Sequence, residues 1–66
     1  MNVPTQGETY AKILEHLIKL QEDCAMMSHL AAANDDRSLA NQWLIVSENF
    51  RKMQHQLTQL ATRGMQ

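Results

Sequence analysis

Seven apolar residues, spaced alternately four and three positions apart, constrain the fold of this chain more than any other feature. They are Leu39, Trp43, Val46, Phe50, Met53, Leu57 and Leu60. An α-helix makes one turn in 3.6 residues, so this spacing gathers all of them along one stripe, as in helices that pack as coiled coils. We assign Trp43, Phe50 and Leu57 to heptad position a and the other four to position d. The stripe predicts a helix over residues 37–63.

An earlier stretch has the same spacing and forms a second stripe. Its residues alternate between positions a and d, beginning at a, and are Tyr10, Ile13, Leu17, Leu20, Cys24, Met27 and Ala31. This stripe predicts a helix over residues 9–33, after a loose lead-in over residues 1–8. Thr5 and Glu8 have the spacing of a capping box, and Thr9 is a competing N-cap. We expect residues 64–66, beyond the later helix, to fray.

The segment Asn34-Asp35-Asp36 separates the two stripes. Short polar side chains such as these favour turns and helix caps. We expect Asn34 to close the first helix in a left-handed conformation, and Asp35 or Asp36 to cap the second. If the first stripe continued in register, polar residues would occupy its core positions, so one unbroken helix would have to change faces. The sequence therefore predicts a turn over residues 34–36.

Folding the chain back at this turn pairs the two stripes. An antiparallel pair places position a opposite position d, and each such pair has residue numbers that add up to 70, as for Cys24 and Val46 or Met27 and Trp43. The centre of this pairing is residue 35, which lies in the turn. The sequence predicts an all-α fold: an antiparallel two-helix coiled-coil hairpin forming one domain over residues 9–63.

The small size of the chain favours self-association. A chain of 66 residues buries only about 60% of the surface that its unfolded form exposes, and a single cysteine excludes an intrachain disulfide. Several apolar residues lie outside the two stripes. Helices of a larger bundle need such additional apolar residues, whereas an isolated hairpin does not. We expect them to form an interface that dimerises the hairpin into a four-helix bundle, with another protein as a further partner. These residues are Leu14, Ile18, Leu44, Ile45, Met26 and Leu30.

The residues able to ligate a soft metal, His16, Cys24, His29 and His55, lack the spacing of a structural zinc motif. We therefore expect no metal and no cofactor. Whether His16 and His55, nearly level in the folded-back pairing, bind a metal in an assembled form stays open. Cys24, at a position a, is expected to pack as a small apolar residue.

The sequence offers no catalytic constellation, and a two-helix hairpin has little concavity in which reacting groups can converge. We predict that the chain is not an enzyme but a small protein-interaction or structural module: an adaptor, a chaperone-like protein or a regulatory subunit. Its start lacks the pattern of a signal peptide, and no apolar run approaches the ~20 residues that span a membrane, so we expect a cytoplasmic protein.

Nucleic-acid binding is the alternative function. It would use the basic residues of the later helix, which are Arg37, Arg51, Lys52 and Arg63. The formal net charge of −1 provides no extended positive field, and no aromatic residue interleaves with these side chains to stack on bases. A solvated helix face is the favoured interpretation of these residues.

Overall fold

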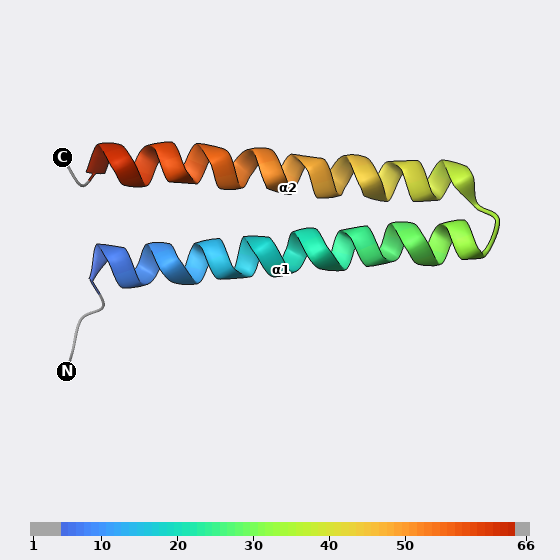
Figure 1. Cartoon of the computed structure of the whole chain (residues 1–66), viewed down its shortest axis with the longest axis horizontal. Helices are drawn as coiled ribbons and strands as arrows, with labels where there is room; N and C mark the ends of the chain where they lie inside the picture. The colour runs from blue at the N-terminus through green and yellow to red at the C-terminus, as the bar shows by residue number, and fades with distance from the viewer. Residues whose placement is uncertain (1–4, 65–66) are drawn as a thin grey trace.

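The computed structural model describes residues 5–64 and contains two long α-helices packed against each other. Helix α1 spans Gln6–Ala33 and helix α2 spans Arg37–Gly64, and they run antiparallel from the turn that joins them (Figure 1). The predicted all-α helical hairpin is confirmed. The smallest extent of the Cα atoms is 9 Å, so the two helices form a single layer with two broad sides. Residues 1–4 of the expected lead-in and residues 65–66 of the expected frayed end lie outside the described residues, whereas Gly64, which was also expected to fray, is the last residue of α2.

Helix α1 begins earlier than the expected start at residue 9, because Thr5 rather than Thr9 is its N-cap. Thr5 has an extended backbone, and its Oγ1 accepts a hydrogen bond from the backbone N–H of Glu8 at 3.1 Å. Thr9 lies inside the first turn, where its hydroxyl donates to the carbonyl oxygen of Thr5 at 3.0 Å. The capping-box spacing thus decided the helix start, and residues 6–8, expected in the lead-in, are helical.

A Schellman motif ends α1. The backbone N–H of Asp36 donates to the carbonyl oxygen of Ala31, and that of Asp35 donates to the carbonyl oxygen of Ala32, each at 3.0 Å. Asp35 adopts the left-handed conformation with φ 60°, whereas Asn34 has φ −94°. The expectation that Asn34 would be the left-handed residue is therefore wrong. The motif places this conformation one residue after the C-cap, and Asn34 is itself the C-cap.

Asp36 caps α2, which is one of the two expected alternatives. Its Oδ1 accepts a hydrogen bond from the backbone N–H of Leu39 at 3.0 Å, and its carbonyl oxygen accepts the first helical bond, from Ala40. A carboxylate at this end also faces the positive end of the helix dipole. Two adjacent aspartates therefore have different tasks: one turns the chain and the other starts the next helix.

The helices contact each other through positions a and e, and not through positions a and d as expected. Every position a residue of the two stripes is buried or half-buried, in agreement with the prediction. Position e, which directly follows d, is buried or half-buried as well, and comprises Leu14, Gln21, Ser28, Ala40, Ser47, Gln54 and Ala61. The seven position d residues remain 37–59% exposed, and are Ile13, Leu20, Met27, Leu39, Val46, Met53 and Leu60.

Small and polar residues at position e explain this rotation of the helices. Ser47 Oγ donates a hydrogen bond across the interface to the carbonyl oxygen of Gln21 at 3.1 Å, and Ser28 Oγ donates to that of Ala40 at 2.8 Å. Such bonds require each serine to lie against the backbone of the opposite helix, where a leucine or methionine side chain would hold the two backbones apart. The numbers of each bonded pair add up to 68, close to the expected pairing.

The core between the helices is consequently small. Among residues 5–64, the buried apolar residues are Cys24, Ala31 and Ala40, and no large side chain is fully buried. Trp43 and Phe50 are half-buried. The hairpin therefore leaves most of its large apolar side chains at the surface.

Candidate functional site

We define the apolar face of the hairpin as the seven exposed position d residues named above. Seen from one end of the molecule, the chain of α1 turns clockwise as it runs away from the viewer. The chain of the antiparallel α2 runs toward the viewer and turns anticlockwise. Because both helices turn position e toward each other, their position d residues lie on the same broad side. The apolar face is thus one continuous surface to which both helices contribute.

The rim of the apolar face carries little charge. Position g borders the face on each helix, and its residues are Thr9, His16, Asp23, Leu30, Gln42, Asn49, Gln56 and Arg63. Only Asp23 and Arg63 carry a formal charge, and three successive rim positions of α2 are amides. Protein interfaces combine an apolar core that is depleted of charged residues with a polar rim, and the apolar face and its rim have this arrangement. The composition of this rim therefore supports contact with a protein.

The six apolar residues that the sequence predicts to form an interface lie on different surfaces of the hairpin. Leu14 lies at position e and is half-buried between the helices, while the other five are exposed. Ile18 and Leu44 share position b, on the broad side opposite the apolar face. Met26 and Ile45 lie at position c, on the outer surfaces, and Leu30 lies on the rim of the apolar face. These residues do not form one patch.

The apolar face was missed because its residues were assigned to the contact between the helices. Position e held a signal that could have corrected this assignment: across both helices it carries no charged residue, and most of its residues are small or amides. Alanine and serine at heptad spacing allow close approach of two helices. Large residues at the neighbouring position d are then left outside the contact.

The four basic residues of α2 do not converge on one site. Arg51 and Lys52 line a shallow hollow on the outer surface of the helix, together with His55 and Glu48. Arg37 lies in the first turn of α2 and Arg63 in its last, so about 40 Å of helix separates them. The hollow therefore combines two basic side chains and a histidine with one carboxylate, so its charge is small and of mixed sign.

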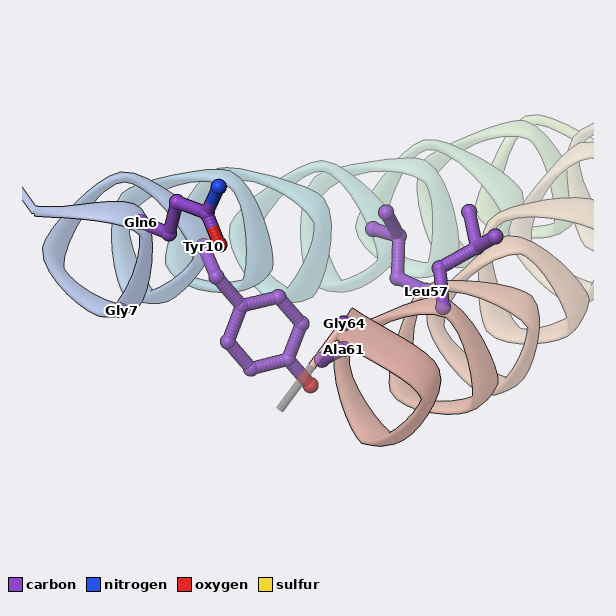
Figure 2. A pocket seen from close by; sticks show the side chains of 7 residues that line it. Gln6, Gly7, Tyr10, Leu57, Ala61 and Gly64 are labelled. Atoms are coloured by element: carbon purple, nitrogen blue, oxygen red, sulfur yellow. The ribbon is translucent and has the colours of Figure 1, made fainter. Parts of the chain in front are cut away.

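A second hollow lies at the open end of the hairpin, between the first turns of α1 and the last turns of α2 (Figure 2). The ring of Tyr10 reaches across to α2, where its hydroxyl lies 3.4 Å from Thr58 Oγ1. The hollow is lined by Gln6, Gly7, Tyr10, Leu57, Leu60, Ala61 and Gly64. Of the residues 5–64, those that line this hollow include no carboxylate, histidine or cysteine.

The described residues show no assembled metal site. Residues 5–64 contain no group of three or more His, Cys, Asp or Glu side chains placed to hold a metal ion. His16 lies at position g and His55 at position f, so the two exposed histidines point to different sides of the hairpin. Cys24 is a buried free cysteine.

Comparisons with known proteins give no relative: the chain matches no protein-family model, no curated protein and no solved structure. Over residues 5–64, neither helix has the combination of length and apolar composition that crossing a membrane requires.

Proposed function

We propose that this chain is a non-catalytic helical module that acts by binding protein, as an adaptor, a chaperone-like protein or a regulatory subunit. The apolar face is the observation that supports this function. We expect a second pair of helices to cover it, so that the hairpin becomes half of a four-helix bundle. In such bundles each helix buries a stripe wider than the contact with one neighbour needs, and positions a, d and e together form a stripe of that width.

The energetics of burial favour an assembled form. Complete burial of one large aliphatic side chain stabilises by roughly 1.5–3 kcal/mol, and the seven residues of the apolar face keep 37–59% of their surface exposed. Covering the face therefore contributes roughly 5–10 kcal/mol from this chain alone. Association costs about 4–15 kcal/mol in translational and rotational freedom. Because the partner also buries apolar surface, the two contributions together are sufficient for binding.

Site-specific photocrosslinking in cells tests this function. A photoreactive phenylalanine analogue replaces Met53 on the apolar face, and the matched control carries it at the adjacent Lys52 on the outer surface. We expect protein adducts from position 53 and few from position 52, because only position 53 is buried in an assembly. Equal adduct yields from both positions, or none from either, would contradict the proposal.

A second candidate function is nucleic-acid binding through Arg51, Lys52 and His55, which line one hollow of α2. A protein that neutralises several phosphates loses affinity steeply as salt rises. We expect RNA and DNA titrations of the chain to show weak binding with a shallow salt dependence, because the basic residues are few and separated. Tight binding that falls steeply with salt would favour this function over the first.

A further inference from the structure

We propose that the partner covering the apolar face is a second copy of this chain, so that two hairpins pack face to face as a twofold symmetric four-helix bundle. This inference rests on the proposed function and names its partner. It differs from self-association through Ile18 and Leu44, which lie on the opposite broad side.

The rim of the apolar face is suited to meet an identical rim. A twofold interface brings the same patch of both subunits together, so a rim of one charge sign would face a rim of the same sign in the other subunit. Gln42, Asn49 and Gln56 avoid this repulsion, since an amide side chain both donates and accepts hydrogen bonds and is complementary to another amide. If the partner were a protein with a strongly charged surface, a rim carrying the opposite charge would be expected instead.

The dimensions of the hairpin also fit a stable dimer. A standard protein interface removes about 800 Å² from each partner. Each helix has 28 residues and is about 42 Å long, and two such helices side by side are about 20 Å across with their side chains, so such an interface occupies nearly all of one broad side. The apolar residues extend along about 30 Å of this length, from Leu39 in the first turn of α2 to Leu60 in its next-to-last turn. One broad side of the hairpin is therefore large enough.

The opposite broad side is less suited to the same role. Its position b residues include only two large apolar side chains, Ile18 and Leu44, and two arginines, Arg37 and Arg51. In a twofold dimer formed through this side, the arginines of one subunit would approach those of the other. The remaining residues there are alanines and a threonine, which bury little area.

Analytical ultracentrifugation of the full chain at about 100 μM tests the proposal. The parent is expected to sediment as a dimer. The double variant Leu20→Gln/Met53→Gln removes two side chains from the apolar face, and Ile18→Gln/Leu44→Gln is its matched control on other surface. The substituted residues are 45% and 40% exposed in the first variant and 41% and 48% exposed in the second, so the two lose similar surface. Glutamine retains good helix propensity in both.

The first variant is expected to raise the dimer dissociation constant by roughly 100-fold, and the control to change it by less than about threefold. A parent that sediments as a monomer overturns the proposal, as does a control that dissociates at least as readily as the first variant. A monomeric parent whose position 53 still crosslinks to a different protein leaves the proposed function standing. A parent that forms neither dimers nor crosslinked adducts at position 53 would contradict both the dimer and the proposed function.

Distance measurements on the folded dimer provide a check that does not depend on the variants folding. A spin label introduced by Asn49→Cys lies on the rim of the apolar face, and one introduced by Arg51→Cys lies on the opposite side, both near the middle of α2. Cys24 is buried, so brief labelling selects the added cysteine. The distance between subunits should be shorter for position 49 than for position 51. Equal distances or the reverse order would overturn the assignment of the face.

Discussion

Asp35 holds a backbone conformation that L-residues rarely adopt, with φ 60°, at the position of the Schellman motif where glycine is most common. Its carboxylate lies between the negative end of the α1 dipole and the positive end of the α2 dipole, so the two dipole effects oppose each other. The left-handed backbone is therefore the effect that acts against stability. Asp35→Gly should therefore stabilise the hairpin by about 0.5–1 kcal/mol after the entropy of glycine in the unfolded chain is subtracted. Thermal unfolding followed by circular dichroism measures the change.

Replacing the neighbouring Asp36 is expected to change stability in the opposite direction. Its Oδ1 accepts the hydrogen bond from Leu39 that caps α2, so Asp36→Ala should destabilise the hairpin by about 1 kcal/mol. At this chain length 1 kcal/mol corresponds to roughly 4–8 °C in Tm. If the two variants changed Tm in the same direction, the separate roles of the two aspartates in the turn would be wrong.

At the scale of the helices, Ser47 shows which positions form the contact. It is 6% exposed, and its hydroxyl lies 3.1 Å from a carbonyl oxygen of α1. Ser47→Leu should force the helices apart and destabilise the hairpin by roughly 1–3 kcal/mol, as overpacking usually does. Asn41→Leu, at an exposed position of the same helix, is the matched control and should change stability by less than about 0.5 kcal/mol. Urea unfolding of both variants compares the two free energies.

Phe50 lies at position a and belongs to the contact between the helices. Phe50→Ala should therefore cost roughly 3 kcal/mol, the lower end of the range for this change because the ring is only half-buried. That loss is a large fraction of the stability of so small a domain, and the variant should be largely unfolded at room temperature. Far-ultraviolet circular dichroism at 25 °C tests this. A variant that melts within a few degrees of the parent would show that position a is misassigned.

The sequence was sufficient to predict two helices, their antiparallel pairing and the turn between them, because the apolar stripes at Tyr10 and Leu39 repeat on either side of a run of turn-forming residues. It was not sufficient to predict how each helix is rotated. Position a is flanked by large apolar residues at d and, apart from Leu14, by small or amide residues at e, as in the pair Val46 and Ser47. A stripe defined by hydrophobicity selects d, whereas close contact between two backbones selects e.

For the whole molecule, the difference between positions d and e means that the contact inside the hairpin and the apolar face at its surface are formed by different residues. Position a holds the hairpin together through apolar side chains such as Phe50, and position e through small side chains and hydrogen bonds such as that of Ser28 to Ala40. Position d holds seven large aliphatic side chains, which the hairpin leaves 37–59% exposed. The apolar face can therefore be recognised in the sequence only after the inner contact has been assigned to positions a and e.

A dimer formed through the apolar face predicts that Tm depends on protein concentration. Folding and association are then linked, and mass action favours the folded dimer as concentration rises. Unfolding enthalpy is about 0.7 kcal/mol per residue near 60 °C, so two chains of 66 residues give about 90 kcal/mol. For a folded dimer that unfolds to two separate chains, this enthalpy corresponds to an increase in Tm of about 5 °C for each tenfold increase in concentration.

Calorimetry of the parent between about 10 μM and 1 mM should therefore show Tm rising by about 10 °C. The variant Leu20→Gln/Met53→Gln should show a smaller rise, since mass action acts on Tm only where dimers form. The variant Ile18→Gln/Leu44→Gln, altered outside the apolar face, should retain the slope of the parent. A parent whose Tm is constant over this range folds as a monomer, which would overturn the dimer, and adducts from position 53 would then decide whether a different protein covers the apolar face.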